Sequence, residues 1–290
     1  MVPPQMQEEF TQKLNRNELI YNITLDNVQR IINEERQQQR KNSVATKDGT
    51  RNHILRHFIR NLTKPTIFIM GGAHAREWIG PAQVLHIIYE LVERNAKNKH
   101  LIEHIDWYLL PTLNPDGYEY TFEEDRMWRK NRRRVSKTCI GVDTNRNFDY
   151  KWKSESKCGD TFPGYRSFSE PETIAIKKFA ESIKYQLKLY LTFHSYSEII
   201  LYPWSYTTKE VPNNYNKLKK IAKNLEKILG HDYTSGVPGN ILFYNAYGSS
   251  MDWFKGHLNV DLVFAIELSP GQSGEIDGNY YGFALPITTS

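Results

Sequence analysis

Short apolar runs alternate with amphipathic segments along most of the chain. Apolar runs predict buried strands, and apolar residues spaced three or four apart predict helices. Strands are expected at residues 64–72, 104–118 (ending in a turn), 187–195 and 261–269. Helices are expected at residues 21–39, 77–95, 168–186 and 213–230.

Two of the predicted helices carry recognisable end signals. Ser169 is followed by Pro171 and Glu172, which predicts a capping box at the start of the helix in 168–186. The helix in 213–230 has asparagine at its start and Gly230 at its end, as expected for helix caps.

Alternating strands and helices predict an α/β fold with a mixed, largely parallel β-sheet sandwiched by helices. A chain of 290 residues can form this fold as a single domain. We expect residues 1–20 to be a polar N-terminal extension and residues 21–290 to be the folded domain.

Composition excludes some classes of function. The formal charge of +5 is mild for this length, so no nucleic-acid partner is implied. The basic run at 126–134 lacks a nucleic-acid-binding motif and is interpreted mainly as a solvated face. No segment approaches the roughly 18 apolar residues of a membrane helix, so no membrane partner is expected.

The numbers of cysteines and glycosylation sequons bear on whether the protein is secreted. The chain has two cysteines, Cys139 and Cys158, and N-x-[ST] sequons at Asn22 and Asn61. Free buried thiols and chance sequons explain these counts equally well, so they leave secretion open.

Candidate chemistry lies at strand ends, where ligands bind in sheets of this kind. His74, His194 and Glu267 each occur at or near such an end, and Glu77 follows His74 by three residues. A catalytic zinc typically has three nitrogen or oxygen ligands from the protein. A helix-capping carboxylate beside a structural histidine is the local alternative.

A second H-x-x-E pair serves as an internal control. His100 and Glu103 have the same spacing, but they lie between a predicted helix and a predicted strand. We interpret this pair as surface polarity, so the spacing alone does not establish a metal site.

Several motifs in fixed order extend the pattern beyond this pair. They are HAREWI (74–79), NPDGY (114–118), RMWRKNRR (126–133), GVDTNRNFDY (141–150), FSEPET (168–173), LTFHSYSEIILYPWSY (191–206), ILFYNAYGSSMDW (241–253) and FAIELSPG (264–271). Over residues 21–288 the chain resembles the zinc metallocarboxypeptidases of the pancreatic A/B type. The resemblance implies a zinc-dependent exopeptidase acting on the C termini of peptides and proteins.

The resemblance also assigns roles at the metal site. It implies one zinc ion held by His74, Glu77 and His194, with Asp143 orienting His74. Glu267 becomes the general base that takes a proton from the attacking water and passes it to the leaving amine.

For the substrate, the resemblance assigns Arg129 to the carbonyl oxygen, and Asn145 and Arg146 to the terminal carboxylate. Tyr244 is implied to be a mobile lid. Arg76, Tyr196 and Phe283 match residues that line neighbouring subsites. Cys139 and Cys158 match a family disulfide, which makes secretion the expected location.

Met251 stands where B-type enzymes have an acidic residue, so we expect hydrophobic or aromatic C-terminal residues, as in the A type. Ser205 and Gly239 match B-type positions and would give a roomy pocket. B-type specificity for Lys or Arg, an inactive peptide-binding homologue, and an amidohydrolase acting on N-acylated amino acids remain alternatives.

The resemblance departs at both ends of the chain. The family continues into a long C-terminal helix, whereas we expect that helix to be lacking after the YGFALP segment (281–286). The segment before His74 is shorter than the family's paired strands. We expect no inhibitory pro-segment within the chain, and we expect a pro-segment or protein inhibitor as an additional partner.

Overall fold

The computed structural model describes residues 64–284, apart from residues 156, 231, 277 and 278. The helix predicted at 21–39 and the sequons at Asn22 and Asn61 lie outside the described residues.

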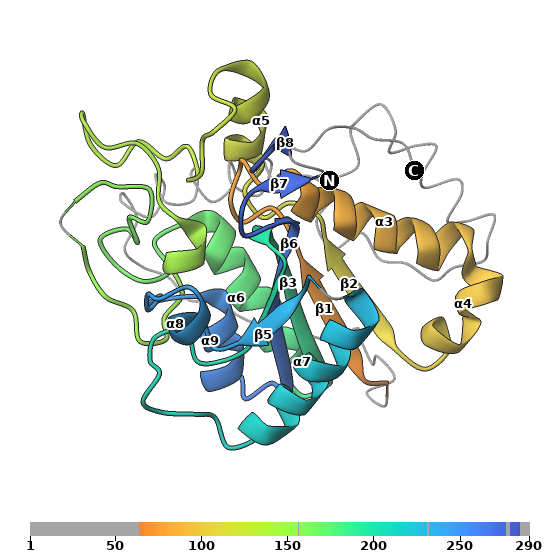
Figure 1. Cartoon of the computed structure of the whole chain (residues 1–290). Coiled ribbons are helices and arrows are strands. Elements are labelled where there is room, and N and C mark those ends of the chain that lie inside the picture. The colour runs from red at the N-terminus through yellow and green to blue at the C-terminus, as the bar shows by residue number, and fades with distance from the viewer. Residues whose placement is uncertain (1–63, 156, 231, 277–278, 285–290) are drawn as a thin grey trace, which may run out of the picture. The chain divides into compact units, whose positions relative to one another are not determined.

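Six strands form the main sheet, in the spatial order β2-β1-β3-β6-β4-β5 (Figure 1). Neighbouring strands in β2-β1-β3-β6 are parallel, β4 runs antiparallel to β6, and β5 is parallel to β4. The strands are β1 (Thr66–Met70), β2 (Asp106–Leu110), β3 (Leu187–Ser197), β4 (Ile199–Leu201), β5 (Thr234–Gly236) and β6 (Leu262–Gly271). A separate hairpin pairs β7 (Glu275–Ile276) with β8 (Asn279–Tyr280).

Helices lie on both faces of the sheet (Figure 1). They are α3 (Ile79–Glu93), α4 (Asn95–Ile102), α5 (Pro115–Glu123), α6 (Pro171–Ile183), α7 (Tyr215–Leu229), α8 (Pro238–Ile241), α9 (Ser250–Gly256) and a short 3₁₀ turn, η1 (Thr144–Arg146). The single-domain α/β fold with a mixed, largely parallel sheet is confirmed.

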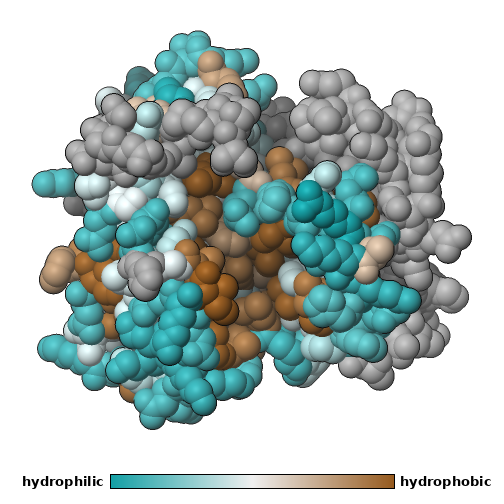
Figure 2. Space-filling model, turned by 45° about the vertical axis from the view of Figure 1, so that its right-hand side comes forward, coloured by the Kyte–Doolittle hydropathy of each residue, from teal (hydrophilic) through white to brown (hydrophobic). Residues whose placement is uncertain are grey.

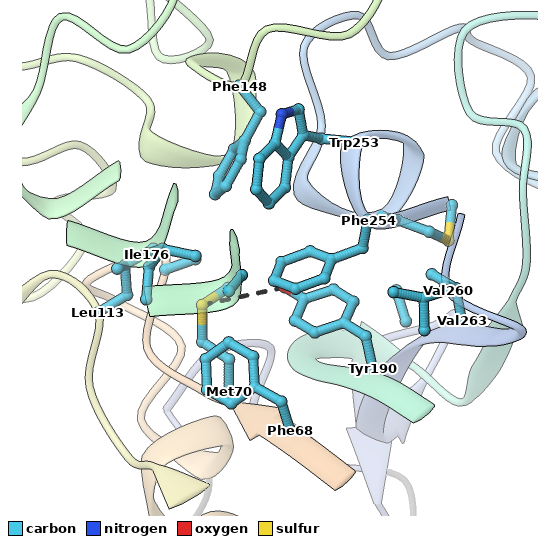
Figure 3. Close-up of a cluster of buried hydrophobic side chains, with 14 of the residues drawn as sticks. Phe68, Met70, Leu113, Phe148, Ile176, Tyr190, Trp253, Phe254, Val260 and Val263 are labelled. Atoms are coloured by element: carbon cyan, nitrogen blue, oxygen red, sulfur yellow. Dashed lines mark hydrogen bonds between the residues drawn. The ribbon is translucent and has the colours of Figure 1, made fainter. Parts of the chain in front are cut away.

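Successive side chains along each strand point to opposite faces of the sheet, so each strand contributes to a hydrophobic core on both faces. Phe68 and Met70 of β1 pack with α6 and α9, whereas Ile69 packs on the α3 side. On the first face, Tyr190 of β3 stacks on Phe254 of α9 with ring centroids 3.6 Å apart (Figure 3). Long apolar strands are therefore buried on both sides, as the continuous apolar runs predicted.

Among the described residues, the other face, which carries α3 and α7, is less completely covered. Figure 2 shows apolar surface filling a depression that hydrophilic surface borders. On this face the fully buried cluster contains Val84 of α3 and residues of β1, β3 and β6. Partly buried apolar residues pack against it; they include Ile67, Ile87, Ile88, Leu191 and Tyr233. Within the described part of the chain, no helix is long and apolar enough to cross a membrane.

Some local predictions are wrong. The segment after β2 is not only a turn, because α5 begins directly after Asn114, whose side chain accepts a hydrogen bond from the backbone nitrogen of Gly117. The capping box at α6 does not form. Glu170 precedes the helix, and Ser169 Oγ instead donates to the Glu170 carboxylate (2.6 Å). The expected Gly230 cap ends α7, but Asn214 makes no capping hydrogen bond with its side chain.

Candidate metal centre and substrate cavity

The loop between β1 and α3 carries His74 and Glu77, and it is held by backbone packing. A Cβ atom at Gly71 would lie 2.9 Å from the carbonyl oxygens of Gly80 and Pro111, and Gly72 has a φ of +63°. Only glycine fits both positions without moving the neighbouring backbone. The following turn thereby reaches the carboxyl end of the sheet.

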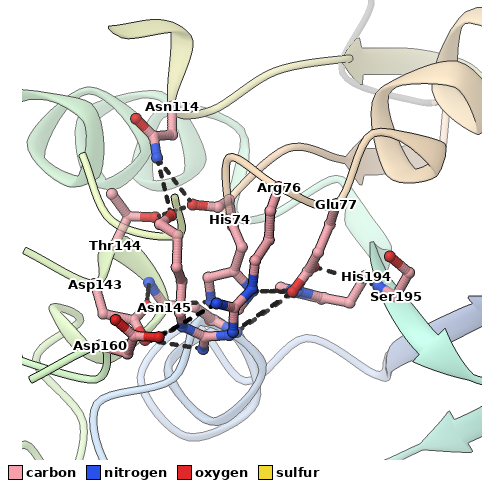
Figure 4. A network of polar contacts seen from close by, with 12 residues as sticks. His74, Arg76, Glu77, Asn114, Asp143, Thr144, Asn145, Asp160, His194 and Ser195 are labelled. Carbon is pink, nitrogen blue, oxygen red and sulfur yellow. Dashed lines mark hydrogen bonds and ion pairs between the residues drawn. The ribbon is translucent and has the colours of Figure 1, made fainter. Parts of the chain in front are cut away.

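Side chains and backbone from other segments fix the turn itself. Thr144 Oγ1 donates to the carbonyl oxygen of Ala73 (2.9 Å), and the backbone nitrogen of Ala75 donates to the carbonyl oxygen of Arg129 (2.9 Å). Asn114 Nδ2 reaches the carbonyl oxygen of Ala73 at 3.5 Å (Figure 4). The ligand-bearing loop is thus tied to three separate parts of the chain.

His74, Glu77 and His194 converge although 117 residues separate the last two. His74 Nδ1 lies 2.7 Å from Glu77 Oε1, His194 Nδ1 lies 3.0 Å from Glu77 Oε2, and the two Nδ1 atoms are 3.1 Å apart. All three side chains are buried. Two imidazole nitrogens and a carboxylate therefore share one small space.

This donor set fits zinc. Ligand atoms about 2.0–2.1 Å from a tetrahedral zinc lie roughly 3.3 Å from one another. Here one ligand atom from each of the three residues can be chosen so that all lie within 4.8 Å of one another. His74 presents Nδ1 to this group and Nε2 to Asp143 Oδ1 (3.2 Å), so the carboxylate fixes which nitrogen is free to ligate.

Electrostatics keep the carboxylates at the centre ionised. Burial by itself would raise the pKa of Glu77, but the charges and hydrogen bonds of His74 and His194 outweigh it and lower the pKa. Burial likewise opposes ionisation of Asp143, yet Arg129 and His74 hold its pKa well below the ordinary value. Both groups are therefore poised as anions beside the ligand cluster.

Arg129 donates from Nε (3.1 Å) and Nη2 (2.9 Å) to Asp143 Oδ2. This pairing leaves Nη1 on the side of Glu77, 3.7 Å from Oε1. Arg129 lines the cavity beside the ligands. Its guanidinium can therefore keep its ion pair and still present a donor to the cavity.

Glu267 lies on β6 opposite His194 on β3 and lines the same cavity. Burial raises its pKa to about 7; the charge of His194 opposes the rise and the charge of Glu77 adds to it. A carboxylate with a pKa near neutrality can both accept and return a proton at physiological pH.

The cavity has a volume of about 330 Å³, within the usual range for ligand sites. The cavity is also lined by Asn145, Arg146 and Tyr244, which are far from the metal ligands in the sequence. Among the described residues, no carboxylate lies within ion-pair distance of Arg146. Tyr244 is 53% exposed, so the core does not hold its ring.

The comparisons with known proteins agree with this geometry. The sequence model of the zinc carboxypeptidase family matches residues 30–289. The chain belongs to the zinc carboxypeptidase family. This is a metallopeptidase family whose members use zinc and act on C-terminal peptide bonds, and the His74, Glu77 and His194 group is capable of binding that metal.

Named relatives include both specificity classes. The chain is 41% identical to zinc carboxypeptidase A 1 of Anopheles gambiae over 77% of this chain and 52% of that protein. It is 40% identical to carboxypeptidase B of Astacus astacus, over 77% of this chain and 74% of that protein. The chain thus spans between about half and three quarters of these relatives.

Solved structures show the same fold. Bovine thrombin-activatable fibrinolysis inhibitor, in complex with tick carboxypeptidase inhibitor, superposes with a TM-score of 0.68 at 36% identity, covering 77% of this chain and 75% of that chain. Carboxypeptidase A from Helicoverpa armigera gives a TM-score of 0.69 at 32% identity, covering 78% of this chain and 56% of that chain.

One expectation about the N-terminal region is wrong. Residues 1–35 match the carboxypeptidase activation peptide, so the chain does contain sequence of the family's pro-segment type. The polar composition of residues 1–20 gave no sign of this. The boundary expected at residues 20 and 21 stays a prediction.

Of the three residues expected in neighbouring subsites, Tyr196 and Phe283 line the cavity and Arg76 contacts Phe283. Phe283 packs edge-to-face on Tyr196 with ring centroids 4.9 Å apart, and both line the cavity. The guanidinium of Arg76 lies 4.6 Å from the Phe283 ring centre and donates to Asp160 (3.2 Å). Arg76 itself is not among the described residues that line the cavity.

Met251 and Ser205 also line the cavity, and their role in specificity stays a prediction. Ser205 Oγ lies 2.6 Å from Ser249 Oγ, so the two hydroxyls hydrogen-bond to each other. Gly239 does not line the cavity; a Cβ atom there would meet Thr208 and Asn245.

Cys139 and Cys158 form a disulfide, as the resemblance implied. The bond closes a loop that contains Asp143, Asn145 and Arg146. The control pair behaves as expected, because His100 on α4 and Glu103 are both exposed and neither belongs to a metal-binding group of described residues.

Sequence reasoning missed two polar residues at this site. Thr192 is fully buried, and its Oγ1 lies 3.3 Å from His194 Nε2. Ser250 donates to Asn145 Oδ1 from its backbone nitrogen and from Oγ, both at 2.9 Å. The period of two along a strand was the available signal for Thr192, since residues 192 and 194 share a face.

Proposed function

We propose that the protein is a zinc-dependent carboxypeptidase that removes single residues from the C termini of peptides and proteins. The observation that carries the proposal is one cavity that combines a metal-ligand group, a carboxylate of raised pKa and the guanidinium of Arg146, which has no carboxylate within ion-pair distance among the described residues. When bound by His74, Glu77 and His194, zinc supplies Lewis-acid chemistry that polarises a carbonyl and acidifies water.

Glu267 is the proposed general base. Its carboxylate accepts a proton from the attacking water and returns it to the nitrogen of the leaving amine. A pKa of about 7 suits both steps, because neither protonation state is then strongly favoured near neutral pH. The neighbouring charge of His194 favours the ionised form in which the base begins the reaction.

Arg129 is the proposed donor to the scissile carbonyl oxygen. Its Nε and Nη2 are held by Asp143, so the guanidinium is oriented before substrate arrives. A preoriented donor stabilises negative charge without reorganisation during the reaction.

Arg146 and Asn145 are the proposed clamp for the terminal carboxylate. A guanidinium can bind a carboxylate through two parallel hydrogen bonds, and the Asn145 amide is held in place by Ser250. An internal peptide bond offers no carboxylate to this clamp, which favours exopeptidase over endopeptidase activity. Tyr244, exposed at the same end, is the proposed lid.

We propose a preference for hydrophobic or aromatic C-terminal residues, supported by Met251 in the cavity wall. Apart from Glu77 and Glu267, whose roles are proposed above, no acidic side chain lines the cavity among the described residues, so a substrate Lys or Arg would lack a carboxylate partner of its own. B-type specificity is the alternative, since relatives of both types occur. An inactive peptide-binding homologue is disfavoured by the complete set of ligands, base and clamp.

We also propose that the protein is secreted and that a pro-segment or a protein inhibitor binds it before activation. The disulfide supports an oxidising compartment, and the activation-peptide match supports a pro-segment. Measuring free thiols in protein from culture medium and from cell lysate tests the location; a reduced, cell-retained form would contradict it.

The test of activity uses zinc-loaded protein and peptides that differ only at the C-terminal residue, with products read by mass spectrometry. We expect loss of single C-terminal residues, Phe and Leu before Arg, abolished by a chelator and by Glu267→Gln. Glu103→Gln, in the exposed control pair, should leave the rate unchanged. Internal cleavage, or activity that survives Glu267→Gln, refutes the proposal; faster release of Arg refutes the specificity alone.

A further inference from the structure

Ser205 reaches the cavity from the segment that follows β4, and hydrogen bonds tie it to a different part of the chain. Its backbone nitrogen donates to Asp252 Oδ1 (2.8 Å), and its carbonyl oxygen accepts from the backbone nitrogen of Ala246 (2.8 Å). Its Oγ lies 2.6 Å from Ser249 Oγ. Every polar group of Ser205 is therefore bonded to residues within 246–252.

The carboxylate of Asp252 binds two successive backbone groups of that segment. Its Oδ2 accepts from the backbone nitrogens of Ser205 (3.1 Å) and Tyr206 (3.0 Å), in addition to the bond at Oδ1. The backbone nitrogen of Asp252 itself donates to Ser249 Oγ, the N-cap of α9. In a capping box such a carboxylate would bind the backbone of its own helix end, whereas here it crosses to the segment after β4.

Asp252 is fully buried and is not among the described residues that line the cavity. It therefore acts on the cavity only through its neighbours. Met251, the preceding residue on α9, lines the cavity, and so does Ser205. The carboxylate thus fixes the backbone of one lining residue to the helix that carries the other.

We propose that Asp252 is a positioning residue that sets the shape of the pocket for the C-terminal side chain of the substrate. By binding the backbone of Ser205 and Tyr206, it holds the segment after β4 against α9. The separation between Ser205 and Met251 is then fixed before substrate arrives. Discrimination among C-terminal side chains depends on that separation.

Burial makes the loss of Asp252 consequential. Without the carboxylate, the backbone nitrogens of Ser205 and Tyr206 lose their acceptor, and an unsatisfied buried donor is costly. The segment after β4 would shift to satisfy these groups, and a connecting segment moves more readily than a helix. The inference rests on the pocket of the proposed function, but one of its two tests requires no catalysis.

The first test compares kcat/KM for two peptides that differ only in ending with Phe or with Ala. In Asp252→Ala we expect the Phe-to-Ala ratio to fall about 10-fold, mainly through a higher KM for the Phe peptide. A smaller fraction of active protein would lower both rates equally and cancel from the ratio. General damage to the fold is thereby separated from a change in the pocket.

Asp252→Asn is the conservative variant. It has the same shape and keeps one oxygen acceptor, so it decides the outcome if Asp252→Ala does not fold. We expect its Phe-to-Ala ratio to fall by about three-fold, between the wild type and Asp252→Ala. Thermal unfolding of each variant reports the fraction that is folded.

Asp261→Asn is the matched control. Asp261 also accepts side-chain hydrogen bonds, from Asn214 and Lys217, but it is exposed and is not among the described residues that line the cavity. Its substitution should leave the Phe-to-Ala ratio as it is in the wild type. A shift as large as that of Asp252→Asn would contradict the proposal.

The second test measures binding without turnover. Titration calorimetry of the zinc-loaded full chain with 3-phenylpropanoate and with propanoate gives two dissociation constants. Both acids carry the same carboxylate, so any effect through the Arg146 clamp cancels from their ratio. We expect the preference for the phenyl compound to fall in Asp252→Asn by about the same three-fold as in the kinetic test.

The outcomes separate this inference from the proposed function. If the wild type prefers 3-phenylpropanoate but releases no C-terminal residue, the proposed activity fails, and the binding ratio still decides the role of Asp252. If both Asp252 variants keep the wild-type ratio, the positioning role is refuted while the activity stands. A wild type that binds the two acids equally refutes the pocket, and the role of Asp252 with it.

Discussion

His194 on β3 and Glu267 on β6 are direct partners in the parallel register of the two central strands. Their side chains therefore point to the same face, and both reach the cavity. A ligand and the proposed base are placed by the sheet itself, whose geometry is more rigid than that of loops. The spacing between them is consequently insensitive to loop motion.

This arrangement predicts a strong effect of shortening the base. Glu267→Asp keeps the charge and withdraws the carboxylate by one methylene, and a misplacement of about 1 Å can cost about 100-fold in rate. We expect kcat to fall about 100-fold while zinc affinity and KM stay within a few-fold of the wild type. Steady-state kinetics check this, and a kcat close to that of the wild type would show that Glu267 does not transfer the proton.

The carboxylate clamp predicts discrimination between free and blocked C termini. We expect the wild type to cleave a peptide acid at least about 100-fold faster, in kcat/KM, than the same peptide with a C-terminal amide. Arg146→Lys should lose most of this preference, because an ammonium cannot form the two parallel hydrogen bonds. The ratio of kcat/KM for the two peptides is the measurement.

A matched control separates the clamp from general charge effects. Arg166→Lys changes an exposed arginine outside the cavity and should keep the wild-type ratio. Equal ratios for the wild type and Arg146→Lys would mean that the terminal carboxylate binds elsewhere.

The cavity wall predicts a change of specificity from a single substitution. Met251→Asp places a carboxylate in the wall, so C-terminal Arg should be favoured over Phe by about 10-fold or more in kcat/KM relative to the wild type. Met251→Leu preserves an apolar wall and should keep the preference for Phe. Competition between the two peptides, read by mass spectrometry, measures the ratio; an unchanged ratio in Met251→Asp would exclude this position from contact with the substrate.

Buried Glu172 predicts a pH dependence of stability. Burial raises its pKa from 4.5 to about 7; nearby Glu170 adds to the rise, and the amide of Asn131 opposes it. The folded state therefore keeps a proton that the unfolded chain releases, and stability falls as pH increases between about 4.5 and 7. The difference corresponds to about 3 kcal/mol of unfolding free energy.

Glu172→Gln removes this proton exchange. Urea unfolding at pH 5 and pH 7.5 should show a smaller loss of stability in the variant than in the wild type. Asp252, whose pKa burial raises to about 6, contributes in the same direction in both proteins and cancels from the comparison. A variant with the same pH slope as the wild type would show that Glu172 ionises normally.

The sequence predicted the long strands well, because β1, β3 and β6 are buried on both faces and read as continuous apolar runs. It did not reveal β4 or β5, which have three residues each and carry too little pattern. The helix α5 was taken for a turn because Pro115, Asp116 and Gly117 are typical turn residues. Here they occupy its first turn, where proline and an acidic residue also fit.

The site was only partly accessible to local reasoning. His74 and Glu77 share their spacing with the exposed pair His100 and Glu103, so sequence distance could not tell them apart. The difference is tertiary, since His194 arrives from another strand. The capping box failed for a similar reason: Glu170 and Glu172 both accept hydrogen bonds from Asn131, an interaction invisible in the α6 sequence.

The loop that carries the ligands His74 and Glu77 is fixed by packing around Gly71 and Gly72, which does not involve the residues proposed to determine substrate preference. The atoms that confine these glycines are mainly backbone atoms, so side-chain changes elsewhere leave those contacts in place. Ser205 and Met251, in contrast, lie after β4 and on α9, and neither of these elements bears a metal ligand. New substrate preferences can therefore arise or be engineered at those positions while the bond-breaking machinery is inherited unchanged.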